Sequence, residues 1–175
     1  MGNCFKSGTK PYEGFTFKIG LLGRSSTGKT AIANRFSSNS FNPNYTHTRK
    51  NIVAVKSYVL DEANGVMTLE LWELQNNLTV PMDAAIITIE STYSIEEIQD
   101  IYKDWLYQAR KLSIPQVHVA ITMSDLGTYT EQDAEKIRSA LGMSSDSRVF
   151  VISASSNTGI TKMMKSVLSA LIRKK

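Results

Sequence analysis

Hydrophobic and polar residues follow a strand-like pattern in six segments of the chain. In three segments apolar residues occupy alternate positions, and the other three are short, mostly apolar runs typical of buried strands. The six segments are residues 15–22, 51–60, 66–74, 84–89, 117–121 and 149–152. Between the second and the third, residues 61–65 contain Asn-Gly, which is a strong signal for a hairpin turn.

Helical patterns occupy much of the remaining chain. One helix opens at residues 31–36, and Ser94-Ile95-Glu96-Glu97 form a capping box that opens a long amphipathic helix to about Leu112. A shorter helix follows Thr130 and ends at Gly142, and the last one spans residues 160–172. Residues 37–50 are polar and without a repeat, so they predict a long loop. Strands and helices alternate after the hairpin, so we expect an α/β sheet with helices on both faces.

Residues 23–30 (GRSSTGKT) fit G-x-x-x-x-G-K-[ST], the phosphate-binding loop, between a predicted strand and a predicted helix. Backbone N–H groups of such a loop converge on an anion. Lys29 would reach the β- and γ-phosphates, and the Thr30 hydroxyl would bind Mg²⁺. The motif predicts a nucleoside triphosphate site, and the alternative is a chance match in a connecting loop. Since ligands of such sheets bind beyond the carboxyl ends of the strands, the loops near residues 75, 123 and 154 should share this rim.

The composition fits one ordinary globular domain. Of the 175 residues, 42% are hydrophobic and 21% charged, no apolar run approaches the length of a membrane span, and no cleavable secretory signal opens the chain. We expect a mobile tail at residues 1–14 and a single domain at residues 15–175. The two histidines have no partners at ligand spacing, which disfavours a zinc-type site. Arg110-Lys111 indicate a solvated helix face rather than a nucleic-acid patch.

Several motifs together resemble the Ras superfamily of small GTPases, the Rab branch most closely, over about residues 15–173. Besides the phosphate loop, residues 41–48 (FNPNYTHT) are similar to the first switch of Rabs, and the framework is similar at residues 83–87, 105–106 and 114–115. The resemblance implies a six-stranded, mostly parallel sheet with one antiparallel edge strand, five helices, and GTP or GDP bound with Mg²⁺. It assigns the Mg²⁺-binding switch threonine to Thr48. Because Arg49-Lys50 replace the usual Ile-Gly, Thr46 is the alternative.

The motif for hydrolysis departs from the family pattern. Where the family has Trp-Asp-Thr-Ala-Gly-Gln, residues 72–77 read Trp-Glu-Leu-Gln-Asn-Asn. Glu73 keeps an anionic oxygen for Mg²⁺. Asn76 replaces the glycine whose N–H meets the γ-phosphate. Asn77 replaces the glutamine that orients the attacking water, and its amide stands on a side chain one carbon shorter. Gln75 is the alternative if the loop shifts by two residues. The resemblance therefore implies impaired hydrolysis.

The base-reading motifs are also altered. The family's Asn-Lys-x-Asp corresponds to Thr122-Met123-Ser124-Asp125, and its Ser-Ala-Lys corresponds to Ser153-Ala154-Ser155. Asp125 can accept hydrogen bonds from guanine N1–H and N2–H₂, and adenine has no donors at these positions. The Ala154 N–H can donate to guanine O6. Met123 could lie along the purine, whereas Thr122 lacks the amide that ties the loops together. The alternative is that Asp125 is an ordinary turn residue before Leu126-Gly127.

These patterns predict a guanine-nucleotide-binding switch or adaptor with weak or absent hydrolysis. Alternatives are a pseudo-GTPase that binds no nucleotide, and a competent GTPase that receives an arginine from a partner. Effectors or regulators would bind through residues 37–50 and 73–82. The predicted metal ligands are Thr30, Thr48 and Glu73, and the predicted catalytic residues are Asn77 or Gln75. The predicted nucleotide-binding residues are Gly23, Ser25, Ser26, Thr27, Gly28, Lys29, Thr30, Ala31, Thr48, Asn76, Thr122, Met123, Asp125, Ser153, Ala154 and Ser155.

The first residues predict a lipid anchor. Gly2 after the initiator Met suits N-myristoylation, although Lys6 stands where Ser or Thr is usual, and Cys4 suits palmitoylation. As the only cysteine, Cys4 also excludes an intramolecular disulfide and fits a reducing compartment. One myristoyl chain binds membranes only marginally, so a second signal is needed, and the basic Lys6 and Lys10 could add to it. We expect peripheral attachment at the cytosolic face of a membrane, the alternative being an unmodified tail.

Overall fold

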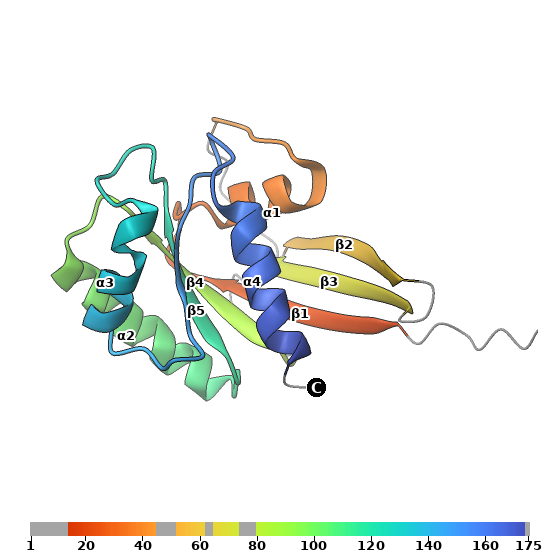
Figure 1. Ribbon diagram of the computed structural model, residues 1–175. Helices are drawn as coiled ribbons and strands as arrows, with labels where there is room; N and C mark the ends of the chain where they lie inside the picture. The colour runs from red at the N-terminus through yellow and green to blue at the C-terminus, as the bar shows by residue number, and fades with distance from the viewer. Residues whose placement is uncertain (1–13, 45–51, 62–64, 74–79, 174–175) are drawn as a thin grey trace, which may run out of the picture.

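A six-stranded sheet lies at the centre of the molecule (Figure 1). The computed structural model describes residues 14–44, 52–61, 65–73 and 80–173. The strands are β1 (Phe15–Leu22), β2 (Ile52–Asp61), β3 (Gly65–Glu73), β4 (Ala84–Glu90), β5 (Val117–Thr122) and β6 (Val149–Val151). All six predicted strands are confirmed, and no end differs from its predicted position by more than one residue.

The strands follow the order β2-β3-β1-β4-β5-β6 across the sheet. β2 pairs with β3 in antiparallel register, from Ile52 opposite Glu73 to Asp61 opposite Gly65, which confirms the predicted hairpin. The remaining neighbours pair in parallel. β2 is therefore the antiparallel edge strand, and the sheet is that of the small-GTPase α/β fold.

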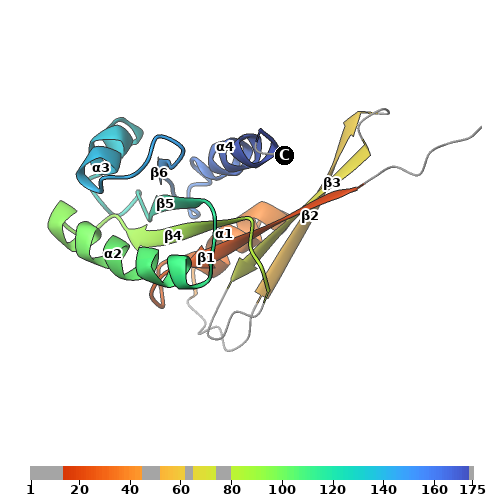
Figure 2. The same ribbon diagram turned by 90° about the horizontal axis from the view of Figure 1, so that it is seen from below.

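Helices cover both faces of this sheet (Figures 1 and 2). The α-helices are α1 (Lys29–Ser38), α2 (Ile95–Lys111), α3 (Ala134–Ala140) and α4 (Ile160–Ile172), and a 3₁₀ turn, η1 (Glu131–Asp133), precedes α3. α1 and α4 pack on one face, where Phe36 and Met163 are buried, and α2 and α3 pack on the other around Ile98 and Ile137. The described residues form four α-helices where the resemblance implies five, and residues 74–79 lie outside the described ranges.

The loop expected at residues 37–50 begins later than predicted. α1 continues through Ser37 and Ser38, whose hydroxyls donate to the carbonyls of Ala33 (2.9 Å) and Asn34 (3.0 Å), four residues earlier. Asn39 then ends the helix with φ at 53°. Serines bonded to their own helix and an asparagine in the left-handed region are compatible with a helix end, so the polar pattern did not mark the boundary.

The start of α2 matches the predicted capping box. Ser94 Oγ accepts from the Glu97 N–H (3.3 Å), and the Glu97 carboxylate accepts from the Ser94 N–H (2.8 Å). Two of the helix's initial N–H groups are satisfied in this way. α2 covers β4, whose first six residues are buried. The stability of α2 therefore contributes to the hydrophobic core on the face of the sheet that α2 and α3 cover.

We expect Ser94→Ala to lower the free energy of unfolding by about 1 kcal/mol, because the mutant leaves the Glu97 N–H without its side-chain acceptor. Chemical denaturation at equilibrium measures this difference. Ser169→Ala is the matched control, since Ser169 is exposed and donates only to the carbonyl of Lys165 within α4. Equal stability of Ser94→Ala and the wild-type chain would contradict the capping role.

Candidate nucleotide-binding site

The phosphate loop joins the end of β1 to the start of α1, and its backbone turns sharply. Gly23, Ser26 and Gly28 have φ values of 144°, 65° and 84°. At Gly23, a Cβ would lie 2.3 Å from Thr88 Oγ1, a contact that is too short for real atoms. Glycine at this position therefore lets the loop pass directly over the end of β4.

The loop presents a row of available donors. Within the described residues, the backbone N–H groups of Ser25, Ser26, Thr27 and Gly28 donate to no acceptor. The N-terminus of α1 follows immediately, and the first N–H groups of a helix lack acceptors within that helix. Converging N–H groups at a helix start form an anion site, so the geometry fits a phosphate.

The ammonium group of Lys29 is enclosed by the same loop. Its Nζ donates to the carbonyls of Gly23 (3.0 Å) and Arg24 (2.6 Å), and the side chain is only 6% exposed. Burial lowers the pKa of Lys29, and the nearby Glu73 carboxylate partly raises it again. Removing water from an ammonium group disfavours its charged form, which a phosphate beside it would stabilise.

Thr30 and Glu73 place two oxygen donors beside this lysine. Thr30 Oγ1 donates to Glu73 Oε2 at 2.6 Å, and Glu73 is buried at the end of β3. Hydroxyl and carboxylate oxygens are the ligands that Mg²⁺ accepts next to bound phosphates. The residues present therefore fit a magnesium ion, and the longer side chain of Glu73 does reach the loop.

Two threonines fasten the loop to the sheet. Thr27 Oγ1 lies within hydrogen-bonding distance of both the Arg24 carbonyl (2.9 Å) and Thr88 Oγ1 of β4 (2.6 Å). Thr88 Oγ1 in turn donates to the carbonyl of Leu22 (2.9 Å). Thr27 and Thr88 are both buried. The loop is thus held in its curled shape by the protein itself.

Asp125 lies at the opposite end of the rim, where two serines hold its carboxylate. Ser153 Oγ donates to Oδ1 (2.6 Å), and Ser155 Oγ donates to Oδ2 (2.7 Å). Hydrogen bonds from Ser153 and then from Ser155 lower the pKa of Asp125, so the group stays ionised. An ionised carboxylate has about four lone-pair sites, so each oxygen keeps one for a ligand. The group can accept from two adjacent N–H groups of a base.

The neighbouring N–H of Ala154 has no acceptor within the described residues. It stands next to the serine that orients Asp125, on the same loop. A donor beside two acceptor oxygens is complementary to one edge of guanine, in which a carbonyl oxygen adjoins two N–H donors. The structure therefore brings Asp125, Ser153, Ala154 and Ser155 together, as the sequence predicted.

Met123 and Thr122 connect the base-reading loop with its surroundings. Met123 has φ at 57°. Its side chain reaches the phosphate loop, since a Cβ added to Gly28 would lie 3.8 Å from the Met123 Cε. Thr122 Oγ1 donates to the carbonyl of Ile89 (3.2 Å). Ser91 adds a second link, because its Oγ donates to the Met123 carbonyl (2.6 Å). These contacts hold the loops together in the absence of the family's asparagine amide.

Arg35, on the last turns of α1, holds the base-reading loop from the other side. Its Nε donates to the Ala154 carbonyl (2.7 Å), Nη2 to the Ser155 carbonyl (3.0 Å) and Nη1 to the Asn39 carbonyl (2.8 Å). The guanidinium also lies 5.6 Å from the ring centre of Phe41. One side chain thus joins the loop at residues 153–155 to the segment that follows α1.

The profile of the Roc family, described as "Ras of Complex, Roc, domain of DAPkinase", matches residues 18–125. The match covers more than half of the chain, from β1 through Asp125. The chain belongs to the Roc family. Roc is a GTPase domain of the Ras superfamily, so a switch-type, GTP-binding class of domain is supported, and such domains generally bind GTP or GDP with Mg²⁺. The match does not confirm the Rab branch, and no curated protein matches the chain.

Several predicted site residues of this Roc domain lie outside the described ranges. They are Thr46, Thr48, Gln75, Asn76, Asn77, and the predicted lipidation positions Gly2 and Cys4. Their assigned roles, including the membrane anchor, stay predictions of the sequence. Among the described helices none is long and apolar enough to span a membrane. The described part of the Roc domain contains no group of three or more His, Cys, Asp or Glu residues that could hold a metal ion, and the magnesium site would use one carboxylate, Glu73, with the hydroxyl of Thr30.

The structure adds three residues that the sequence motifs did not reveal. Thr88 of β4 contacts the phosphate loop, Ser91, the residue after β4, donates to Met123 of the base-reading loop, and Arg35 orders the loop at residues 153–155. Thr88 had a visible signal, since it is the one hydroxyl in the apolar run of residues 84–89. Arg35 had none, because its three acceptors are backbone carbonyls, two of which come from residues more than 115 positions later.

We expect Arg35→Ala to speed release of a fluorescent GDP analogue from the Roc domain by roughly 10-fold, because three charge-assisted hydrogen bonds to the loops are lost. Arg35→Lys should restore only part of the effect, since an ammonium cannot form the same fork. Stopped-flow displacement by excess unlabelled GDP measures the rate. Arg110→Ala on the exposed surface of α2 is the matched control. Equal release rates for Arg35→Ala and this control would exclude the orienting role.

Proposed function

We propose that this Roc domain is a guanine-nucleotide-binding switch or adaptor, of the Rab or Ras type, with weak or absent intrinsic GTP hydrolysis. The observation that carries the proposal is the buried ammonium of Lys29. It is enclosed by a loop whose backbone N–H groups at residues 25–28 have no acceptor among the described residues. A folded module that only binds proteins has no physical need for this arrangement, because a partly desolvated charge costs stability.

The residues of the site divide the recognition of a nucleotide among them. The loop N–H groups and Lys29 would bind the phosphates, and Thr30 with Glu73 would hold Mg²⁺, which neutralises charge on the phosphate oxygens. Asp125 and the Ala154 N–H would select guanine, with the carboxylate oriented by Ser153 and Ser155. Met123 would contribute apolar surface between the two ends of the site.

Slow hydrolysis follows from the residues after Glu73. Such proteins accelerate phosphoryl transfer mainly by positioning the attacking water. Asn77 offers an amide one carbon shorter than the family's glutamine, and Asn76 carries a Cβ where the family has glycine. Effectors or regulators would read the nucleotide state through residues 37–50 and 73–82.

The second candidate function is a pseudo-GTPase that binds partners without a nucleotide. Three observations favour it: the replacement of the Asn-Lys pair by Thr122 and Met123, the loss of the usual Lys at Ser155, and hydroxyls already bonded to both oxygens of Asp125. A carboxylate that its own loop satisfies gains less from guanine than one that is free. Nucleotide binding separates the two functions.

We expect GDP with Mg²⁺ to stabilise the wild-type domain by about 4 kcal/mol at 1,000-fold excess over Kd, which raises Tm by on the order of 10 °C. Lys29→Ala should lose this shift, because the mutant lacks the cation that faces the phosphates. Differential scanning calorimetry with and without nucleotide measures both proteins. Lys103→Ala on the exposed face of α2 is the control. Absence of any shift in the wild type would establish the pseudo-GTPase alternative.

Base selection has its own test at Asp125. Asp125→Asn should weaken GDP binding and favour xanthosine diphosphate, because an amide can donate to the oxygen that xanthine carries at C2. Each good polar pair in such a site discriminates by roughly 10-fold or more. Competition between the two nucleotides measures the preference, with Asp104→Asn on α2 as control. Equal affinity of the wild type for ADP and GDP would show that Asp125 does not read the base.

Hydrolysis by the wild-type domain should be no faster than on the order of 10⁻⁴ s⁻¹, the intrinsic range of Ras. The double change Asn76→Gly and Asn77→Gln should raise the rate if the geometry of the water is the deficit. Single-turnover release of phosphate from GTP measures both. Both rates are measured without any partner protein that could supply an arginine. A wild-type rate well above that range contradicts the proposal.

A further inference from the structure

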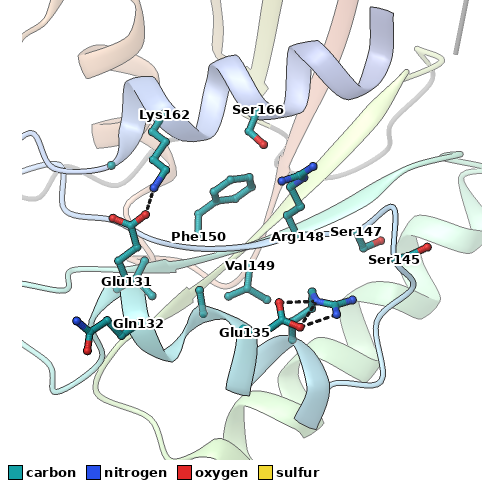
Figure 3. A pocket seen from close by; sticks show the side chains of 14 residues that line it. Glu131, Gln132, Glu135, Ser145, Ser147, Arg148, Val149, Phe150, Lys162 and Ser166 are labelled. Carbon is teal, nitrogen blue, oxygen red and sulfur yellow. Dashed lines mark hydrogen bonds and ion pairs between the residues drawn. The ribbon is translucent and has the colours of Figure 1, made fainter. Parts of the chain in front are cut away.

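The edge strand β6 lies in a groove that the nucleotide site does not use. The sheet order leaves β6 paired with β5 on one side only, within the described residues. A groove of about 450 Å³ runs along its other side, between α3 with η1 and α4 (Figure 3). Its volume is in the range of ligand-binding pockets.

The backbone of β6 offers unpaired hydrogen-bonding groups to this groove. The Arg148 carbonyl accepts from the Val119 N–H (2.9 Å), and the Ile152 N–H donates to the Ile121 carbonyl (2.8 Å). Successive residues of a strand alternate in direction, so the N–H and C=O groups of Val149 and the N–H of Val151 point away from β5. Val149 and Val151 line the groove with only 7% and 8% of their surfaces exposed, and unpaired backbone groups at the edge of a sheet accept an added strand.

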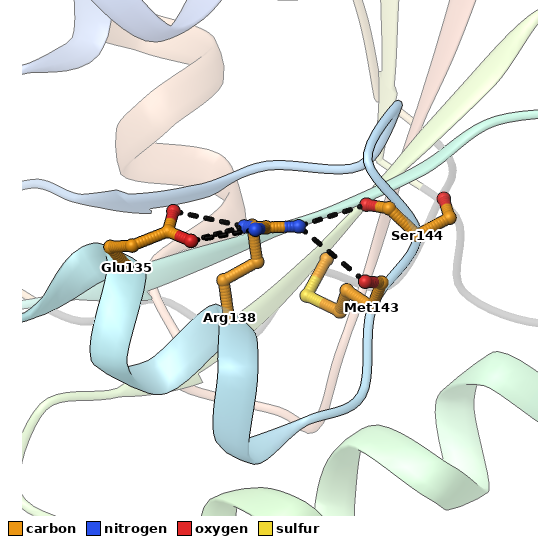
Figure 4. A network of polar contacts seen from close by, with 4 residues as sticks. All are labelled: Glu135, Arg138, Met143 and Ser144. Atoms are coloured by element: carbon orange, nitrogen blue, oxygen red, sulfur yellow. Dashed lines mark hydrogen bonds and ion pairs between the residues drawn. The ribbon is translucent and has the colours of Figure 1, made fainter.

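One ion pair joins the two walls of the groove, and a second lies within α3. Lys162 of α4 pairs with Glu131 of η1 across one end (Figure 3). Glu135 pairs with Arg138 at 2.6 Å, and the Arg138 guanidinium also donates to the carbonyls of Met143 (3.5 Å) and Ser144 (3.3 Å) (Figure 4). These contacts fix the loop that leads from α3 to β6, so the groove is built by the protein rather than left by chance.

Arg148 is the one charged residue of the described lining that forms no ion pair with another described residue. It is exposed, and Figure 3 shows its guanidinium pointing toward Ser166 of α4, beside the half-buried ring of Phe150. The lining has three cations (Arg138, Arg148, Lys162) against two carboxylates (Glu131, Glu135), so the groove carries one uncompensated positive charge. An acidic ligand therefore suits it.

We propose that the groove binds an extended acidic peptide segment of a partner protein. The segment adds a short strand to β6 through the backbone groups of Val149 and Val151. One of its carboxylates pairs with Arg148, and an apolar side chain lies on Phe150. Because only two residues of β6 offer outward groups, the interaction is weak and transient, as for regulatory contacts. It is separate from the nucleotide site and does not depend on the proposed function.

The test uses the whole chain and a fluorescein-labelled octapeptide of the sequence Asp-Ser-Val-Ser-Asp-Ser-Val-Ser. Its Asp and Val residues alternate along one face of an extended strand, as Arg148 and Phe150 do at β6. Binding should shift the NMR amide resonances of Val149 and Val151 and leave that of Gly28 in place. Arg148→Glu should weaken binding by about 10-fold in fluorescence polarisation. Lys165→Glu, with the same change of charge on the exposed face of α4 outside the groove, should stay within about twofold. Equal Tm values of both variants confirm that they are folded.

Four outcomes would overturn the proposal. One is equal binding of the same peptide with Lys in place of Asp, and another is an equal loss of affinity in Lys165→Glu, since either indicates diffuse charge attraction. The third is undiminished binding of the acidic peptide after N-methylation of its backbone, which excludes strand addition. The last is a Val149 amide resonance that moves with protein concentration alone, which assigns the edge to a second copy of the chain.

Discussion

The enclosure of the Lys29 ammonium by its own loop is the constraint on which the site depends. The two carbonyls that accept from Nζ belong to Gly23 and Arg24, so the chain must curl back over the start of α1 within six residues. Positive φ angles at Gly23, Ser26 and Gly28 permit this path, and the hydroxyls of Thr27 and Thr88 fix it. The same curl leaves the N–H groups of residues 25–28 without acceptors among the described residues, so the geometry that buries the cation also creates the anion site.

The base-reading end is built by different means from the family pattern. The loop at residues 122–125 lacks the usual asparagine and lysine. Thr122 nevertheless bonds it to β4, Ser91 bonds it to the residue after β4, and the Met123 side chain reaches Gly28. On the facing loop, Ser155 bonds to Asp125, and Arg35 holds the carbonyls of Ala154 and Ser155. Short hydroxyl contacts and one arginine thus replace longer side chains, and they preserve an oriented carboxylate beside an available N–H.

The sequence predicted most of the fold because the signals were local. Alternating and continuous apolar runs located all six strands, and the Ser94 capping box located α2. The phosphate loop, Glu73 and Asp125 were found because each belongs to a motif. The links between loops were not found, since a hydroxyl or guanidinium that donates to a distant carbonyl leaves no pattern along the chain. Ser155 is an example. In the sequence it only marked the loss of the lysine of the Ser-Ala-Lys motif, whereas in the structure its hydroxyl donates to the Asp125 carboxylate.

The most direct test of the account is the nucleotide content of the purified protein. Acid precipitation releases any bound nucleotide, and chromatography with mass spectrometry identifies and counts it against the protein concentration. A Roc domain whose loop holds phosphates and whose Asp125 reads guanine should release GDP or GTP, and a preparation treated with a Mg²⁺ chelator should release less. Release of an adenine nucleotide would contradict the reading of the base. Failure to bind any nucleotide, even after incubation with GDP and Mg²⁺, would contradict the central claim.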